Sequence, residues 1–193
     1  MTFAFATFAP NAEIKLTNNK GEAIMDARVS KLINEQINKE LYSAYLYLDF
    51  ANYYASVGLD GFENWYRIQA QEERDHALLF YQYLQNNGEV VTFESIAKPE
   101  WERGGNEAPL KKGLEHEKYV TELINTIYAA AYDVRDFRTM QLLDWFVKEQ
   151  GEEEKNASDM ITKMELFGTD AKGLYMLNSE LKTRAYSVPS LHF

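Results

Sequence analysis

Residues 70–77 read AQEERDHA, and this stretch is decisive for the fold because it places charged side chains among apolar ones. It lies in a segment whose apolar residues recur every three or four positions, which predicts an amphipathic helix. Glu73 and His76 fall on the apolar face of that helix, and residues three apart project in the same direction. Because a buried face normally excludes charge, these two side chains need partners inside the protein.

The same helical period recurs along most of the chain. The 193 residues include only 10 Gly and 4 Pro, which permits long uninterrupted helices. We expect Asp60 to cap the second helix, Pro109 to lie in the first turn of the third, and Gly168 to end the fourth. The predicted helices cover 26–56, 61–88, 109–132, 137–167 and 170–184.

The segment 89–109 separates the second and third helices. It contains two Pro and a Gly pair and has no sustained period, so we interpret it as a long crossover along the outside of a bundle. Two helical hairpins joined by one crossover predict an all-α, ferritin-like four-helix bundle with a short fifth C-terminal helix. The expected organisation is an N-terminal extension over 1–25, one domain over 26–184, and a C-terminal tail over 185–193.

The composition limits the classes of partner. Thirty acidic against 20 basic residues give a net charge of -10, which argues against nucleic acid and anionic membranes and is compatible with attracting cations. The chain has no cysteine, so disulfides, zinc ribbons and thiolate nucleophiles are excluded. No apolar run is long enough for a membrane span, and the first basic residue is Lys15, unlike a secretory signal. We therefore expect a cytoplasmic protein.

Each of the four long helices carries an acid in the middle of its apolar stripe. In the fourth helix, for example, the predicted inward positions are Leu142, Phe146, Gln150, Glu153, Ala157 and Ile161. The corresponding mid-stripe acids in the other three helices are Glu40, Glu73 and Glu117.

Taken singly, such features have ordinary explanations. A Glu beside an apolar stripe is usually solvated at its edge, and a lone His there is more often a hydrogen-bonded core residue than a ligand. Four acids at one level are different, because burying bare carboxylates together strongly disfavours folding unless a cation lies among them. Carboxylates with one imidazole and no sulfur suit iron or manganese, so the sequence predicts a metal site.

Several segments together resemble the bacterial non-haem ferritins, over about residues 26–182. The segments that carry the resemblance are LINEQINKELYSAYLY (32–47), AQEERDHA (70–77), EHEKYV (115–120), LDWFVKEQGEEEK (143–155) and GLYMLNSEL (173–181).

The resemblance implies a ferroxidase centre that binds two irons. One iron would be held by Glu40, Glu73 and His76. The other would be held by Glu117 and Glu153, with Glu73 bridging. The family pattern also places Gln150 close by, a third iron on Glu72, Glu149 and Glu152 with Glu153 shared, and Tyr47 and Trp145 as possible electron donors.

Differences from other di-iron bundle proteins indicate which of these families the chain does not resemble. The second ligand pair is Gln150-x-x-Glu153 and has no histidine, which counts against bacterioferritin, rubrerythrin and the ribonucleotide reductase radical subunit. Arg74 stands where a bacterioferritin has its haem-binding methionine, so no haem is expected. The fifth helix counts against the miniferritins. Gly151, inside the fourth helix, and the extension before Met25 depart from the family pattern.

The expected function is iron storage and detoxification. As a ferroxidase, the protein would oxidise Fe(II) with dioxygen or hydrogen peroxide and store ferric oxyhydroxide inside a homo-24-mer. One alternative is a small di-iron or di-manganese oxidase or peroxidase that stores nothing. Another is a metal-free helical bundle with a structural role, whose acids would point to solvent.

Overall fold

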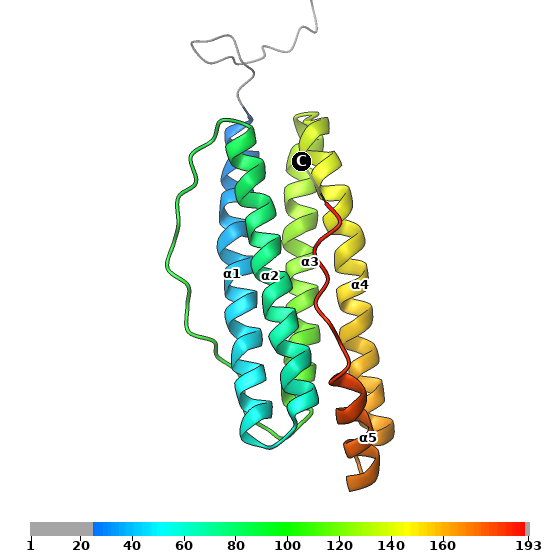
Figure 1. Cartoon of the computed structure of the whole chain (residues 1–193). Helices are drawn as coiled ribbons and strands as arrows, with labels where there is room; N and C mark the ends of the chain where they lie inside the picture. Colours follow the sequence, from blue (N-terminus) through cyan, green and yellow to red (C-terminus); the bar gives the residue numbers. More distant parts are fainter. Residues whose placement is uncertain (1–24, 192–193) are drawn as a thin grey trace, which may run out of the picture.

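The computed structural model describes residues 25–191. Its helices are α1 (Ala27–Ser56), α2 (Asp60–Asn86), α3 (Ala108–Asp133), α4 (Phe137–Phe167) and α5 (Ala171–Leu181), and the described residues form no strand (Figure 1). Apart from Met25, the predicted N-terminal extension lies outside the described residues, as do residues 192–193 of the predicted tail. Among the described helices, none is long and apolar enough to cross a membrane.

Two antiparallel hairpins, α1–α2 and α3–α4, form the bundle, and the segment between α2 and α3 runs the length of α1 on the outside (Figure 1). Side chains of α1 hold this crossover in place. Asn34 Oδ1 accepts from the Thr92 backbone N–H at 2.8 Å, and Trp101 Nε1 donates to Asp49 at 2.7 Å. The predicted fold class, with one long crossover and a short fifth helix, is confirmed.

The start of α2 differs from the prediction. Asp60 is the first residue of the helix and does not cap it, because the N-cap position is Leu59, which has no capping side chain. Asn178 of α5 supplies the cap instead: its Oδ1 accepts from the backbone N–H groups of Gly61 at 2.8 Å and Phe62 at 3.3 Å. A Cβ on Gly61 would lie 1.7 Å from the Asn178 carbonyl oxygen, so only glycine permits this approach.

The core divides into two apolar clusters. The first apolar cluster, which includes Ile33, Phe80 and Phe146, occupies the end of the bundle where α1 begins. The second apolar cluster, which includes Phe50 and Phe62, occupies the end near α5. On every long helix a buried acid falls between the parts that enter these two clusters. The bundle therefore contains one polar layer at mid-height.

Candidate metal centre

The polar layer collects the acids predicted at mid-stripe. Their side chains come from all four long helices, and these acids and their neighbours are between 1% and 7% exposed. The four acids are therefore buried, as the metal-site interpretation requires, and the ordinary alternative of an acid solvated at the edge of its stripe does not apply to them. The buried residues are Glu40 on α1, Glu73 and His76 on α2, Glu117 on α3, and Gln150 and Glu153 on α4.

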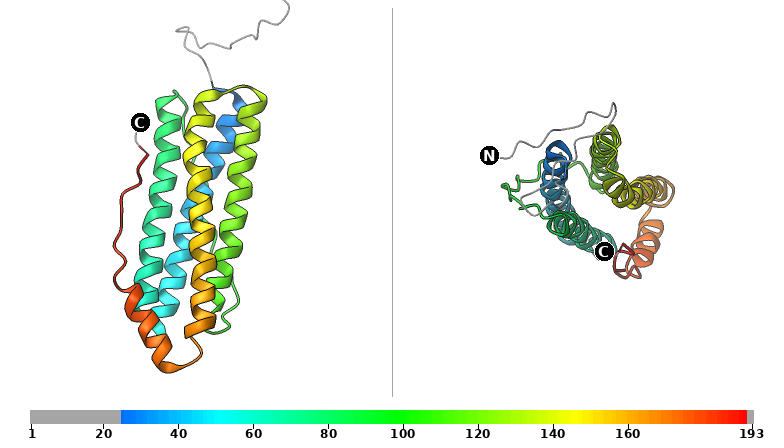
Figure 2. Two further views of the ribbon diagram at one scale, coloured as in Figure 1. Left: turned by 90° about the vertical axis from the view of Figure 1, so that its right-hand side faces the viewer. Right: turned by 90° about the horizontal axis from the view of Figure 1, so that it is seen from above.

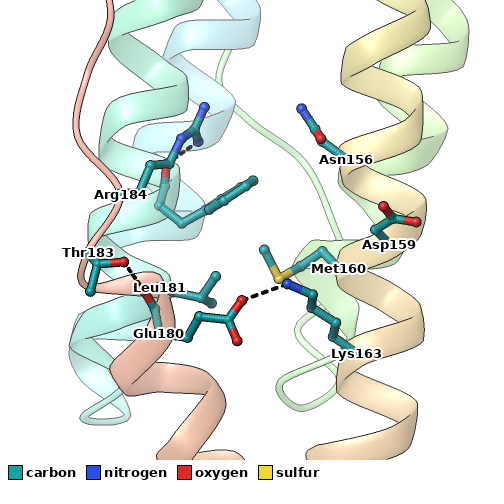
Figure 3. A pocket seen from close by; sticks show the side chains of 9 residues that line it. Asn156, Asp159, Met160, Lys163, Glu180, Leu181, Thr183 and Arg184 are labelled. Carbon is teal, nitrogen blue, oxygen red and sulfur yellow. Dashed lines mark hydrogen bonds and ion pairs between the residues drawn. The ribbon is translucent and has the colours of Figure 1, made fainter.

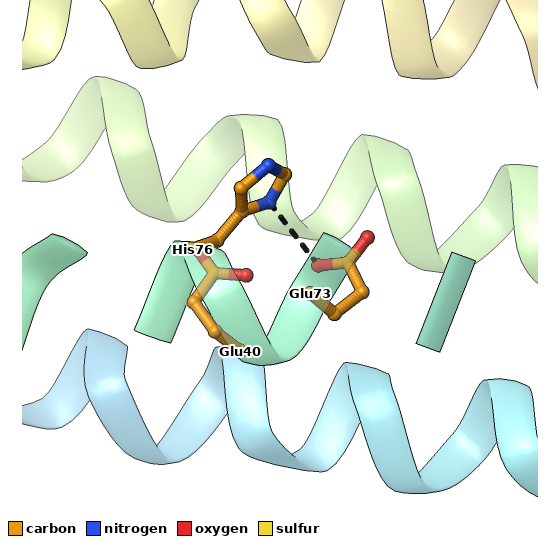
Figure 4. A group of neighbouring side chains, drawn as sticks. All are labelled: Glu40, Glu73 and His76. Atoms are coloured by element: carbon orange, nitrogen blue, oxygen red, sulfur yellow. Dashed lines mark ion pairs between the residues drawn. The ribbon is translucent and has the colours of Figure 1, made fainter. Parts of the chain in front are cut away.

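Glu40, Glu73 and His76 form the tightest group in the layer. One ligand atom from each lies within 4.8 Å of the others, and Figure 4 shows the three side chains turned toward one another from α1 and α2. His76 Nδ1 lies 3.6 Å from Glu73 Oε2. Such a group can offer two carboxylates and one imidazole to a single ion.

Two oxygens in this group have no hydrogen-bond donor in the described chain and are available to a cation. Gln36 Nε2 donates to Glu40 Oε1 at 2.8 Å, but Glu40 Oε2 and Glu73 Oε1 are buried and accept no hydrogen bond from the part of the chain that the structure describes. A buried acceptor without a donor is strongly disfavoured. A metal ion would satisfy both oxygens and neutralise their charge, so the donor set fits a hard cation.

Neutral donors orient the other two acids. The Tyr47 hydroxyl donates to Glu117 Oε1, and Gln150 Nε2 donates to Glu117 Oε2 at 3.2 Å. Gln69 Nε2 donates to Glu153 Oε2 at 2.6 Å. Amides and hydroxyls fix a carboxylate without supplying a positive charge, so the negative charge stays available to an ion. Within residues 25–191, Glu117 and Glu153 do not form a second close group of three ligands.

Burial disfavours the ionised form of the acids in this layer. It raises the pKa of Glu40, and the charge of Glu73 raises it further. Burial likewise raises the pKa of Glu73 and of Glu153, with the charge of Glu117 adding to both. Burial also raises the pKa of Tyr47, followed by the charge of Glu117. A metal ion bound here would displace protons from the acids, which couples metal binding to pH.

The predicted third set of ligands is arranged differently. Glu72 receives a hydrogen bond from Arg184 Nη2 at 2.5 Å, and the exposed Glu152 pairs with Lys148 at 3.2 Å. Glu149 is half-buried, and burial raises its pKa. Glu72, Glu149 and Glu152 do not form a close group in the described chain, and their role as ligands stays a prediction.

Three further buried residues at the layer are not among the predicted site residues. Gln36 and Gln69 orient acids, and His116 Nε2 lies 2.7 Å from Ser43 Oγ. Burial lowers the pKa of His116 to about 4, so it is neutral at pH 7. Gln36 sits four residues before Glu40, a spacing that could have revealed it. Trp145, predicted near the centre, has its ring centroid 5.6 Å from that of His76.

Comparison with known proteins gives a consistent result. Residues 30–167 match the ferritin-like domain family. The chain is 34% identical over 164 residues to the bacterial non-heme ferritin of Campylobacter jejuni, which covers 85% of this chain and 98% of that protein. It is 31% identical over 158 residues to a probable bacterial non-heme ferritin-like protein of Haemophilus influenzae, covering 82% and 96%.

A solved structure shows the same fold. The open pore ferritin of the archaeon Archaeoglobus fulgidus superposes with a TM-score of 0.81 at 38% sequence identity, covering 83% of this chain and 99% of that one. An engineered closed form of that ferritin gives a TM-score of 0.82 at 39% identity. The chain therefore belongs to the ferritin family, and the resemblance to the bacterial non-haem ferritins is confirmed.

Proposed function

We propose that this protein is a ferroxidase that oxidises Fe(II) in its polar layer and stores the ferric product inside a shell of twenty-four copies. Family membership supports iron handling in general. The observation that carries the more specific proposal is the pair of buried oxygens, Glu40 Oε2 and Glu73 Oε1, which lack hydrogen-bond donors in the described chain and lie beside His76. Together with His76 they form an incomplete coordination shell that a cation would complete.

Iron is the substrate here, and the ligands determine its redox behaviour. Glu40, Glu73 and His76 would hold one ion, and Glu117 and Glu153 would hold a second with Gln150 beside it. Anionic oxygen ligands stabilise Fe(III) relative to Fe(II), so binding favours loss of an electron to dioxygen or hydrogen peroxide.

Other side chains of the layer position these ligands. Gln36, Gln69 and Gln150 each donate one N–H to a different acid and thereby hold its carboxylate in place. The Tyr47 hydroxyl, hydrogen-bonded to Glu117, is the nearest candidate for an additional electron donor. Burial raises the pKa of Glu40 and of Glu73, which favours their protonated forms in the metal-free protein and reduces the repulsion between them.

Storage requires a closed cavity. The family assembly supports a homo-24-mer with ferric oxyhydroxide inside it, and the net charge of -10 would help to gather cations at its surfaces. We also propose a cytoplasmic location on the basis of the family. The rival small oxidase without storage would have the same polar layer but no such assembly.

Anaerobic Fe(II) added to the metal-free protein, followed by air, tests the proposal. Near-ultraviolet absorbance reports oxidation and size exclusion reports the assembly. We expect fast, saturable oxidation in a shell of about half a megadalton that stays soluble after many irons per subunit have been added. Glu73→Ala should abolish the fast phase, whereas Glu122→Gln, an exposed acid of α3, should leave it unchanged.

Two other outcomes would contradict the proposal in different ways. A small oligomer that takes up two irons per subunit and stores nothing would identify the rival oxidase. Fast oxidation that persists in Glu73→Ala at the wild-type rate would remove Glu73 from the centre.

A further inference from the structure

The segment after α5 does not extend away from the bundle. Residues 182–191, here called the C-terminal strap, run back along the side of the bundle between α2 and α4 (Figures 1 and 2). Contacts to α2 and α4 attach it. Arg184 contacts α2, the Tyr186 hydroxyl donates to Asp75 of α2 at 2.5 Å, and Trp145 Nε1 of α4 donates to Ser190 Oγ at 3.0 Å.

The strap covers the most open side of the bundle. α1 packs directly on α2 and on α3, and α3 packs on α4, but no Cα of α2 lies within 8 Å of a Cα of α4. Side chains bridge that side instead, as in the Gln69–Glu153 hydrogen bond of 2.6 Å. The polar layer is therefore separated from the strap by side chains alone.

Arg184 is the strap residue that reaches the edge of the layer. Its Nη2 donates to Glu72 Oε2 at 2.5 Å, and its Nη1 donates to Gln69 Oε1 at 2.8 Å and to the Trp65 carbonyl at 3.1 Å. The guanidinium also lies 4.0 Å from the centroid of the Trp65 ring. The Arg184 and Glu72 side chains are each only 17% exposed, so this is a fixed and partly desolvated ion pair.

One of these contacts connects Arg184 to a proposed iron ligand. Because Gln69 Oε1 accepts from Arg184, its amide nitrogen must face the other way, where it donates to Glu153 Oε2. Arg184 thus sets the orientation of the Gln69 amide and, through it, that of Glu153.

Solvent reaches the other side of Arg184. A pocket of about 290 Å³ lies between α2, α4 and the end of α5, and Arg184 forms part of its wall together with Trp65, Met160 and Leu181 (Figure 3). Arg184 lines this pocket, whereas its partner Glu72 does not.

We propose that Arg184 is a tethered cation that occupies Glu72 and thereby limits how many metal ions bind at the α2–α4 side of the polar layer. A divalent ion can bind Glu72 only after the Arg184 guanidinium moves away from it, which breaks an ion pair between the strap and α2. Because the layer must bind cations for this competition to matter, the inference rests on the proposed function.

Anaerobic titration of the metal-free assembled protein with Co2+, followed by calorimetry and by Co2+ absorption, measures the competition. Arg184→Gln should bind one more Co2+ per subunit than the wild type, or bind its last Co2+ about tenfold more tightly. Glu72→Gln combined with Arg184→Gln should return to the wild-type number, since the freed ligand is gone. Arg184→Lys retains the charge and should stay close to the wild type.

Two further variants distinguish competition from a general loss of charge or structure. Lys182→Gln removes a positive charge from the same strap, but Lys182 pairs with the exposed Asp60 at 2.5 Å and should not change Co2+ binding. Glu72→Gln alone should leave the wild-type number unchanged, because Arg184 already occupies Glu72. This variant tests the proposal even if Arg184→Gln fails to assemble.

The possible failures are distinct. If Glu72→Gln alone loses a Co2+, or if Arg184→Gln binds the same number with the same affinity as the wild type, the tethered-cation proposal is wrong while the polar layer remains a metal site. If the wild type itself binds no Co2+ tightly, the proposed function fails first and the competition fails with it.

Discussion

Replacing Glu73 with glutamine should stabilise the metal-free protein, although most substitutions of buried residues destabilise a fold. The Glu73 side chain is 2% exposed, and its Oε1 has no donor within the described chain. Its ligand atom lies within 4.8 Å of one from Glu40. Glutamine keeps the size of the side chain and removes the charge, so it relieves repulsion without leaving a cavity.

The structure sets the size of the effect. Two unit charges separated by 4.8 Å, the upper limit for this pair, repel by about 3.5 kcal/mol at an effective dielectric constant of about 20. Burial and then the charge of Glu117 raise the pKa of Glu73, which favours its protonated form and reduces this repulsion in the wild type. We therefore expect Glu73→Gln to raise the free energy of unfolding by about 1–2 kcal/mol at pH 8.

The gain should depend on pH in a defined direction. With its pKa raised in the folded state, Glu73 holds a proton that the unfolded chain releases. Wild-type stability therefore falls as pH rises from the ordinary pKa of Glu through the folded-state pKa, and then levels off. Glutamine does not titrate, so the advantage of the variant should be smallest below about pH 4 and grow as pH rises through that window.

Thermal unfolding at fixed protein concentration with a chelator present is the assay. At pH 8, Glu73→Gln should melt about 2–6 °C above the wild type, and Glu122→Gln should match the wild type. Added Co2+ should raise the midpoint of the wild type and raise that of Glu73→Gln less, because a ligand is missing. A variant that melts below the wild type at every pH would refute the view that Glu73 carries uncompensated charge.

Three smaller predictions concern individual contacts. Gly61→Ala should lower the melting temperature through a loss of about 2 kcal/mol or more, because its Cβ would lie 1.7 Å from the Asn178 carbonyl; an unchanged melt would mean that α5 does not cap α2. Gly151→Ala should raise the melting temperature through a gain of about 1 kcal/mol, since nothing lies within 4 Å of the added Cβ, and a lower melt would show a contact outside this chain. Tyr47→Phe removes the hydrogen bond to Glu117 and should slow Fe(II) oxidation without changing the number of Co2+ bound, whereas a wild-type rate would exclude Tyr47 from the reaction.

The bounds of a helix could be predicted where the residues that cap its start and its end are its neighbours in the sequence. α4 was expected over 137–167 and spans Phe137–Phe167, with Asp136 capping its start and Gly168 at its end. The start of α2 could not be read in the same way, because its cap comes from Asn178, 117 residues after Gly61. α5 ends at Leu181, three residues earlier than expected, where the chain turns into the strap.

The inward face of α4 shows how tertiary contacts change a simple period. The predicted stripe continued through Ala157 and Ile161, which are only partly buried, whereas Met160 and Met164 are buried in the second apolar cluster. That end of α4 packs against α5. Since the position of α5 is not encoded in the period of α4, the sequence of α4 alone does not reveal which face it covers.

Part of the candidate site could likewise be predicted from the sequence, and part could not. Glu40, Glu73, Glu117 and Glu153 could be found because each interrupts an apolar stripe on its own helix, and all four are buried. Arg184 gives no comparable signal. The sequence predicts it as the last residue of the fifth helix, whereas it lies three residues beyond the end of α5, and its partner Glu72 lies 112 residues earlier. Contacts of this kind depend on the path of the chain in space.

The two apolar clusters explain how the bundle tolerates such a polar layer. Phe80 and Phe146 stack with ring centroids 4.0 Å apart in the first apolar cluster, and Tyr54 and Phe62 stack at 4.9 Å in the second. Burial of large apolar side chains on both sides holds the helices together independently of the acids between them. The layer can therefore lower the stability of the metal-free protein without unfolding it, and that lost stability becomes affinity for a cation when one binds. Removing a charge from Glu73 and removing a ring from a cluster should consequently shift the melting temperature in opposite directions.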